Sequence, residues 1–191
     1  MRIFLTGVGC IGKTTIGEKM AELMGCSFFD LDEEIENYFE TSIEKLQNKF
    51  LTIHSFRNAA AKALINLLSQ PKSENSVIAL PPSGLMSGYW RVVKKNSGIK
   101  IVLTDEPENI LERITFFDIN SNPVEKNLSE KEKCFYLKEI KKDIAYFRRT
   151  FVRADSQVNI CGLNVKEAAI KTIKVATGIE MKSEKSEICC D

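Results

Sequence analysis

The stretch that decides the fold is Arg2-Ile3-Phe4-Leu5-Thr6, followed by Gly7-Val8-Gly9-Cys10-Ile11-Gly12-Lys13-Thr14. Its first part is a short apolar run typical of a buried strand, and residues 14–24 carry apolar side chains at helical spacing. The glycine-rich segment between them fits the G-x-x-x-x-G-K-[ST] pattern without a mismatch. A strand, a glycine loop and a helix in this order predict a phosphate-binding loop, because the loop N–H groups and the helix N-terminus point at an anion.

This loop assigns roles to individual residues. Lys13 would reach the β- and γ-phosphates of ATP, and the hydroxyl of Thr14 would hold Mg²⁺. The residues that we expect to contact the nucleotide are Gly7, Gly9, Cys10, Ile11, Gly12, Lys13, Thr14 and Thr15.

The composition predicts one ordinary globular domain. The chain has 191 residues, of which 43% are hydrophobic and 28% charged. We expect a single domain over residues 1–180 and a disordered charged tail over 181–191, which contains Cys189 and Cys190. The formal net charge of +1 predicts no overall attraction to nucleic acid or membrane. Six scattered cysteines and one histidine argue against a zinc site. With no leader segment or membrane span apparent, we expect a cytoplasmic monomer.

The rest of the chain alternates between strand-like and helical segments. Strands are predicted over 26–29, 76–80, 99–103 and 157–160, and the main helices over 32–39, 53–68, 108–117, 129–149 and 165–176. Residues 118–128 look like a mobile loop. This alternation predicts an α/β fold of three layers (α/β/α) around a five-stranded parallel sheet, with ligands at the carboxyl ends of the strands.

Three charged residues are candidates for the chemistry. Asp30 and Asp32 follow the second predicted strand, whose end should lie beside the first strand and so near the phosphate loop. Residues two apart on an extended segment point to opposite sides. Asp30 could then face a metal, while Asp32 takes a substrate hydroxyl or, alternatively, caps the next helix. Arg57 is followed by Ala59-Ala60-Ala61, so close packing would leave it as a clamp for a carboxylate or phosphate.

Several of these segments together resemble the shikimate kinases, over residues 1 to about 177. The similarity includes the entry to the phosphate loop and Phe29-Asp30-x-Asp32-x-x-Ile35-Glu36. It continues through Phe56-Arg57, Val77-Ile78-Ala79-Leu80, Leu103-x-x-x-Pro107-x-x-x-Leu111-x-Arg113 and Arg153-Ala154-Asp155.

The resemblance implies a P-loop NTPase fold like that of the nucleoside-monophosphate kinases, with ATP and Mg²⁺ at Lys13 and Thr14. It places Asp30 near the metal and Asp32 at the ring hydroxyls of the acceptor. Arg57 would hold the acceptor carboxylate, residues 116–128 would form a lid, and the substrate-binding residues would be Asp32, Arg57, Gly84 and Arg148.

The chain departs from the family pattern on the acceptor side and in the lid. Pro81-Pro82 replaces a run of glycines, Asn122-Pro123 occupies the place of a lid arginine, and Phe116-Phe117 that of another. Phe147 aligns with the second carboxylate-binding arginine, and Ala60 with an acidic residue. We expect the missing lid charge to come from Arg113, Lys126, Arg148 or Arg149.

The sequence thus predicts an ATP-dependent kinase that phosphorylates a small-molecule hydroxyl acceptor, and the resemblance implies that this acceptor is shikimate. Three alternatives stay open: a kinase for another hydroxyl compound such as a sugar acid, a nucleoside-monophosphate kinase, and a nucleotide-binding protein with little activity. The short lid and the Asp30-x-Asp32 pair argue against the nucleoside-monophosphate kinase.

Overall fold

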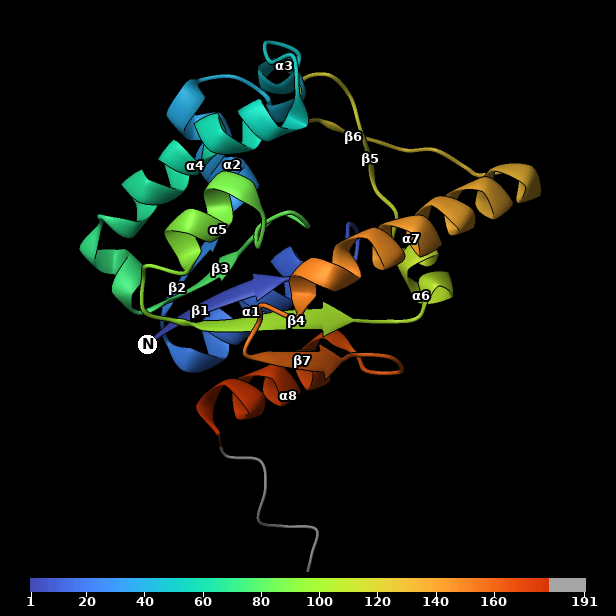
Figure 1. Cartoon of the computed structure of the whole chain (residues 1–191). Helices are drawn as coiled ribbons and strands as arrows, with labels where there is room; N and C mark the ends of the chain where they lie inside the picture. The colour runs from blue at the N-terminus through green and yellow to red at the C-terminus, as the bar shows by residue number, and fades with distance from the viewer. Residues whose placement is uncertain (179–191) are drawn as a thin grey trace, which may run out of the picture.

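The sheet at the centre of the computed structural model is parallel throughout. The model describes residues 1–178, so the predicted tail 181–191 lies outside the described residues. Five strands pair in the order β2-β3-β1-β4-β7 (Figure 1), which confirms the predicted α/β fold. The strands are β1 (Arg2–Thr6), β2 (Ser27–Asp30), β3 (Ser76–Ala79), β4 (Ile99–Thr104) and β7 (Ser156–Asn159).

The helices cover both faces of this sheet. In the part of the chain described, none is long and apolar enough to cross a membrane. The remaining elements are α1 (Lys13–Met24), α2 (Leu31–Phe39), α3 (Ile43–Gln47), α4 (Ile53–Leu68), the 3₁₀ helix η1 (Pro71–Glu74), α5 (Ser87–Val93), α6 (Pro107–Glu112), β5 (Phe116–Phe117), β6 (Pro123–Val124), α7 (Glu130–Phe151) and α8 (Val165–Thr177).

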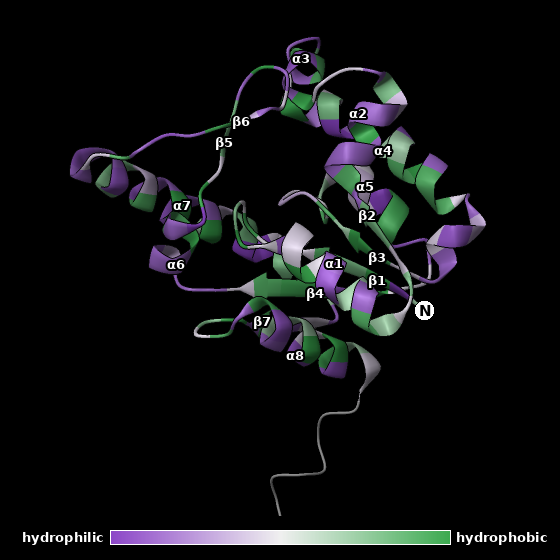
Figure 2. Cartoon of the chain, turned by 180° about the vertical axis from the view of Figure 1, so that it is seen from behind, coloured by the Kyte–Doolittle hydropathy of each residue, from purple (hydrophilic) through white to green (hydrophobic). Residues whose placement is uncertain are grey.

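Strand β1 shows how the sequence produces three layers. All five of its residues are buried, because a central parallel strand has a helix layer on each side. Ile3 and Leu5 belong to a core shared with α1 and α8, whereas Phe4 faces the opposite core with α2, α4 and α5. Strands β3 and β4 are coloured as hydrophobic in Figure 2, and β3 is likewise buried along its whole length. Alternate side chains of one strand therefore contribute to both cores.

The strand order corrects one expectation. The prediction that β2 lies beside β1 is wrong, because β3 is inserted between them and pairs with both. The end of β2 still approaches the phosphate loop, since α1 packs across β3 and β2 as well as β1. The link between the first two strands is therefore made through α1 and its side chains.

The segment after β4 also differs from the prediction. The helix expected over 108–117 ends at Glu112, and Phe116–Phe117 pairs instead with Pro123–Val124 in an antiparallel hairpin. The β-branched and aromatic run Ile114-Thr115-Phe116-Phe117 favours an extended chain over a helix. Residues 118–128, expected as a mobile loop, include the second strand of this hairpin.

Candidate active site

The phosphate loop joins the buried end of β1 to the first turn of α1. Gly12 lies in the left-handed region with φ 95° and precedes the first helical residue, Lys13. A side chain at Gly7 would place its Cβ 2.8 Å from the carbonyl oxygen of Leu103, so only glycine fits against β4 there. No side chain caps the N-terminus of α1 at Gly12, so the first N–H groups of the helix face the loop without a side-chain partner.

Lys13 is held inside the curve of this loop. Its ammonium group donates to the carbonyl oxygens of Val8 at 2.9 Å and of Gly7 at 3.2 Å. Burial lowers the pKa of Lys13, while the charges of Asp32 and Asp30 act in the opposite direction. Because no described carboxylate pairs with it directly, this cation is available to an anion in the loop.

Thr14 and Asp30 form the second feature of the site. The Thr14 hydroxyl donates to Asp30 Oδ2 at 2.6 Å, while Asp30 Oδ1 accepts the backbone N–H of Asp32 at 2.9 Å and so caps α2. Hydroxyl and carboxylate oxygens are the ligands that Mg²⁺ prefers. The described residues contain no group of three or more His, Cys, Asp or Glu side chains that could hold a metal. A metal here would therefore need oxygens from the nucleotide and water as well.

Asp32 lies in the first turn of α2, not on an extended segment. The expected alternation of Asp30 and Asp32 along a strand is thus wrong, because the helix begins at Leu31, and the capping role belongs to Asp30. Asp32 is solvent-accessible at the wall of the cavity described below, and the surrounding protein still desolvates its carboxylate. Burial raises the pKa of Asp32 to about 7, Asp30 adds to this shift, and Lys13 opposes it. A carboxylate with a pKa near neutrality can exchange a proton under physiological conditions.

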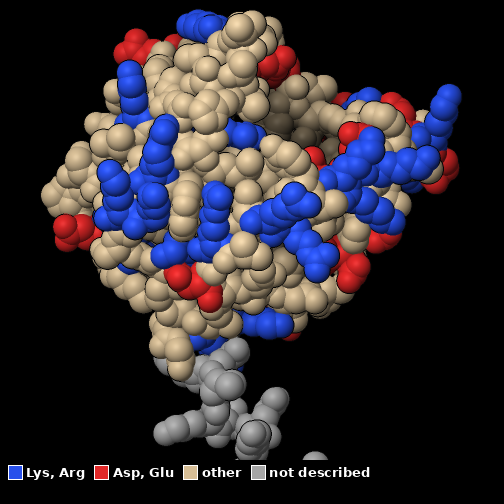
Figure 3. Space-filling model, in the orientation of Figure 1, with Lys and Arg blue, Asp and Glu red and all other residues tan. Residues whose placement is uncertain are grey.

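These groups open into one cavity of about 1060 Å³ at the carboxyl ends of the strands. Figure 3 shows the surface hollowed between the part formed by α3 and α4 and the part formed by α7. The lining residues come from the phosphate loop, α2, α3, the end of β3 and the segment after α6. They are Gly9, Cys10, Gly12, Lys13, Thr14, Thr15, Asp30, Asp32, Glu33, Glu36, Ile43, Glu44, Leu80, Pro82, Glu112, Arg113, Ile114, Thr115, Phe117, Asp118 and Ser121.

The lining contains most of the residues predicted for the nucleotide and few of those predicted for the acceptor. Gly7 and Ile11 are buried behind the loop, so any contact would be through their backbone. Arg57, Gly84 and Arg148 are not part of the lining. The structure thus brings together Lys13, Thr14, Asp30 and Asp32. It does not place Arg57, Gly84 or Arg148 in the same cavity wall.

Arg57 lies on α4, outside the lining of the cavity. Its Nε is buried and has no hydrogen-bond partner among the described residues. Burial and the charge of Asp32 raise the pKa of the neighbouring Tyr89 hydroxyl, and the charge of Arg57 opposes this shift. A Cβ on Gly88 of α5 would meet the Arg57 carbonyl oxygen at 2.7 Å, so α4 and α5 pack closely, as the alanine run indicated. Tyr89 itself was missed, since one tyrosine in an apolar helix gives no sequence signal.

Gly84 and Arg148 have structural reasons for lying elsewhere. The N–H of Gly84 donates to the Pro81 carbonyl at 2.8 Å, and a Cβ on Gly84 would meet that of Leu80 at 2.5 Å, so the glycine closes its own turn. Arg148 is exposed because its neighbours Phe147 and Phe151 turn the buried face of α7 toward the core.

Among the four candidates for the missing lid charge, Arg113 alone lines the cavity. It forms an ion pair with Asp105, whose side chain is almost completely buried at the end of β4. Lys126 pairs with Glu132 at 2.9 Å and lies over the rings of Phe116 and Tyr136. Of these four candidates, Arg113 is therefore the one that the fold places at the cavity.

Sequence reasoning also missed the additional acidic residues in the cavity wall. Glu33, Glu36 and Glu44 join Asp32 in the cavity wall. On α2, Asp32 and Glu36 are four residues apart and so share one helix face. That spacing was present in the sequence, but the contribution of α3 depends on tertiary packing.

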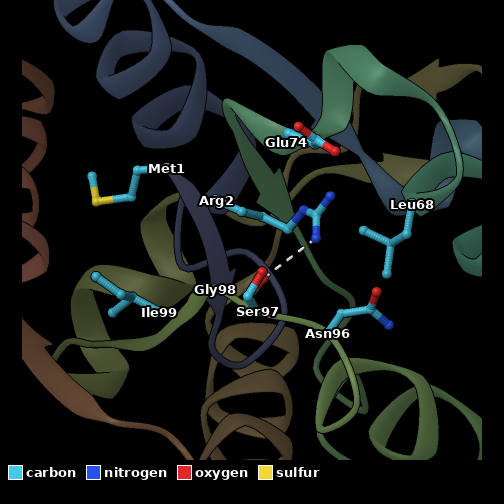
Figure 4. Close-up of a pocket in the computed structure, with 8 residues that line it drawn as sticks. All are labelled: Met1, Arg2, Leu68, Glu74, Asn96, Ser97, Gly98 and Ile99. Carbon is cyan, nitrogen blue, oxygen red and sulfur yellow. Dashed lines mark hydrogen bonds between the residues drawn. The ribbon is translucent and has the colours of Figure 1, made fainter.

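A second hollow of about 740 Å³ lies at the opposite, amino-terminal end of the strands (Figure 4). Arg2 is buried beside it and donates to the Ser73 carbonyl at 2.8 Å, the Ser73 hydroxyl at 2.9 Å and the Ser97 carbonyl at 3.3 Å. These bonds tie β1 to the segments before β3 and β4. The hollow is far from the phosphate loop, and its arginine has a structural role.

Comparisons with known proteins agree with this geometry. A family model described as shikimate kinase matches residues 9–174. A shikimate kinase of Caldicellulosiruptor saccharolyticus is 30% identical over 94% of this chain and 98% of its own length. One of Thermoanaerobacter pseudethanolicus is 27% identical over 90% of this chain and 94% of its own.

Solved structures give the same result. The shikimate kinase of Aquifex aeolicus superimposes with a TM-score of 0.70 and 25% identity, over 96% of this chain and 100% of that one. The Bacteroides thetaiotaomicron enzyme gives a TM-score of 0.74 at 20% identity, over 95% and 99%, which concerns the fold alone. The match of the family model over most of the chain and the 30% identical relative lead to one conclusion: this chain belongs to the shikimate kinase family.

Proposed function

We propose that this protein transfers the γ-phosphoryl group of ATP to a ring hydroxyl of shikimate. The observation that carries the proposal is the grouping of Lys13, Thr14, Asp30 and Asp32 around one cavity in a chain of the shikimate kinase family. The phosphates would lie in the loop with Lys13, and the acceptor would lie toward α2 and α3. The chain would act as a monomeric cytoplasmic enzyme of one domain, with residues 116–128 as its lid.

Mg²⁺ fits the oxygens on the nucleotide side. Thr14 Oγ1 and the Asp30 carboxylate, already 2.6 Å apart, would hold it directly or through water. When bound, the ion would neutralise charge on the β- and γ-phosphate oxygens. The neighbouring Lys13 would add a positive charge from the loop.

On the acceptor side, Asp32 would accept the proton. As the acceptor oxygen bonds to the γ-phosphorus, the bond to the β,γ-bridging oxygen breaks and ADP leaves, while the hydroxyl proton passes to Asp32. A pKa of about 7 keeps a substantial fraction of Asp32 ready to accept it near neutral pH. Arg113 would stabilise charge on the transferring group, and Arg57, whose Nε has no described partner, would turn toward the acceptor carboxylate.

A second candidate is a kinase for another small polyol. It is favoured by the carboxylates Glu33, Glu36 and Glu44 in the acceptor wall and by Pro82 in place of bare glycine backbone. Carboxylates suit the hydroxyl groups of a neutral polyol better than a carboxylated ring. Under this alternative Arg57 would have no role in binding the acceptor.

The test is steady-state ADP release with Mg-ATP, with and without shikimate. We expect release that depends on shikimate and falls at least about 100-fold in Asp32→Asn, with the affinity for ATP kept. The matched control is Asp143→Asn, an exposed position on α7. ATP binding with no stimulation by shikimate would overturn the proposal. A panel of polyols and sugar acids would then distinguish the second candidate from a nucleotide-binding protein without transfer activity.

A further inference from the structure

The tip of the lid rests against α2 and α3. In Figure 1 the chain around β5 and β6 runs from α6 and α7 to the neighbourhood of α3. Ser42 donates its hydroxyl to the carbonyl of Ile119 at 2.6 Å, and Lys45 donates to Asn120 Oδ1 at 2.6 Å. Ser121 donates to Glu36 Oε1 at 2.5 Å. We refer to these three bonds as the lid-tip contact.

The lid tip, residues 118–122, is held in shape by its own hydrogen bonds. Asp118 Oδ1 accepts the backbone N–H groups of Asn120 at 2.7 Å and Asn122 at 2.9 Å, and the N–H of Ser121 donates to the Asp118 carbonyl at 3.0 Å. The backbone and side-chain N–H groups of Asn122 hold the pKa of Asp118 below its usual range. These bonds fix the positions of Asn120 and Ser121, so the tip can meet α2 and α3 as a preformed surface.

The lid-tip contact joins the lid to one side of the cavity only. Its bonds go to α2 and α3, on the acceptor side, and in the described residues no hydrogen bond joins the lid to the phosphate loop. At its base the lid is held by Lys126, which pairs with Glu132 of α7. The lid is therefore attached to the helices that would meet the acceptor, and its tip carries no cation that could grip phosphates.

Glu36 connects this contact to the acceptor site. The same Oε1 accepts the N–H of Ile43 at 2.8 Å and the hydroxyl of Ser121, so Glu36 joins α2, α3 and the lid. Glu36 lines the cavity one helical turn after Asp32. An acceptor that contacts Asp32 would thus lie against the helix face to which the lid is fixed.

We infer that Glu36, Ser42 and Lys45 are positioning residues that couple closure of the lid to binding of the acceptor and not to binding of ATP. This inference rests on the proposed function, because it assigns the acceptor to the α2–α3 side of the cavity. Loss of the lid-tip contact should raise the KM for shikimate and leave the KM for ATP unchanged.

A double-mutant cycle on Lys45 and Asn120 tests the coupling. Lys45→Met keeps the length of an exposed side chain, and Asn120→Ala removes the acceptor of its bond. We expect each variant to raise the KM for shikimate about five- to tenfold, and the double variant no further, because both remove the same bond. The value of kcat and the KM for ATP should stay within about twofold. Lys49→Met, exposed just after α3, is the matched control.

Effects that multiply in the double variant, or an equal rise in the KM for ATP, would overturn the inference. Glu36→Gln is unsuitable as the main variant, because the carboxylate also caps the first residue of α3. Ser121→Ala gives a second measurement from the lid side.

Hydrogen exchange of the lid provides a readout independent of turnover. Asn120, Ser121 and Asn122 carry the bonded N–H groups of the tip, so their exchange reports its opening. We expect at least about threefold faster exchange over residues 118–122 in Lys45→Met and none of this change in Lys49→Met. Unchanged exchange in Lys45→Met would overturn the lid-tip contact. Faster exchange in an enzyme that ignores shikimate would instead overturn the proposed function and leave the contact standing.

Discussion

The part of the cavity that we assign to the nucleotide and the part that we assign to the acceptor, called here the nucleotide half and the acceptor half, are built in different ways. The nucleotide half consists of the phosphate loop and Asp30, and all of its lining except Asp30 comes from one segment, residues 9–15. The acceptor half is assembled from α2, α3, the turn after β3 and the lid, with α4 and α5 behind it. A half made from one local segment keeps its geometry when the rest diverges, whereas a half made from several segments can change at each of them.

The hydrogen bonds of the two halves differ in the same sense. In the nucleotide half, Lys13 and Thr14 already have partners within the protein. Behind the acceptor half, the buried Nε of Arg57 has no partner among the described residues, and several carboxylates line the wall itself. The nucleotide half is preorganised, while the acceptor half leaves groups that a bound molecule could satisfy.

The largest expected effect lies in the nucleotide half. Lys13→Met should lower kcat about 1000-fold, because removal of one preorganised electrostatic group costs 100- to 1000-fold and here the group is charged. Single-turnover phosphoryl transfer measures the effect. Lys19→Met on the same helix, where Lys19 pairs with the exposed Glu22, should stay within about twofold. A mild loss in Lys13→Met would contradict the division of the site into two halves.

A smaller effect is expected where the two halves meet. Arg113→Met should lower kcat about 100-fold, because Arg113 enters the cavity and is held there by Asp105. Arg148→Met should change kcat by less than about twofold, since its side chain is exposed outside the cavity. Measurement of kcat and both KM values for the two variants compares them directly. The opposite ranking would restore Arg148 as a substrate-binding residue.

The fold was largely predictable because its signals are local. The alternation of apolar strands and amphipathic helices indicated a parallel sheet without knowledge of any contact. The order of the strands has no local signal in the sequence, because the insertion of β3 between β1 and β2 depends on how the helices pack. The helix expected to reach Phe117 ended early because the pairing of Phe116–Phe117 with a strand seven residues later outweighed the helical spacing.

The same distinction applies to the site. The positions of Lys13 and Thr14 at the cavity were predictable, because the phosphate-loop pattern fixes them by sequence alone. Asp30 lies beside them as predicted, but through α1 and not through the expected pairing of β2 with β1. Tyr89, the glutamates of the acceptor wall and the lid-tip contact were not predictable, because each depends on side chains brought together from separate segments. The position of Arg148 required the register of α7, in which Phe147 and Phe151 face the core.

Close packing behind the acceptor half gives a third prediction. Gly88→Ala should lower the free energy of unfolding by about 1–3 kcal/mol, because its Cβ would meet backbone atoms of Arg57 and Asn58 at 2.7 and 2.9 Å. The displaced Arg57 should also raise the KM for shikimate while the KM for ATP stays the same. Urea denaturation and kinetics measure both. Gly9→Ala, whose Cβ would meet no atom within 4 Å, should leave unfolding unchanged.

The smallest expected effect concerns Asp32, between the two halves. Its pKa is raised from 3.8 to about 7, so between these values the folded state binds more protons than the unfolded state. The free energy of unfolding therefore falls as the pH rises from about 4 to about 7. The stability that protonated Asp32 contributes at low pH is lost above pH 7. Asp32→Asn should consequently be more stable than the wild type at pH 8, by at most about 1 kcal/mol because water in the cavity screens the charge.

Thermal unfolding in EDTA at pH 4 and pH 8 checks this difference without metal. A gain of 1 kcal/mol corresponds to about 2–4 °C for a chain of this size, and the gain should disappear at pH 4, where Asp32 is protonated in the folded wild type. A variant that is less stable at pH 8 would mean that the charge of Asp32 is compensated by Lys13. In that case Asp32 would be held as an ion pair with Lys13 and not as a carboxylate destabilised by burial, and it would be a weaker proton acceptor than we propose.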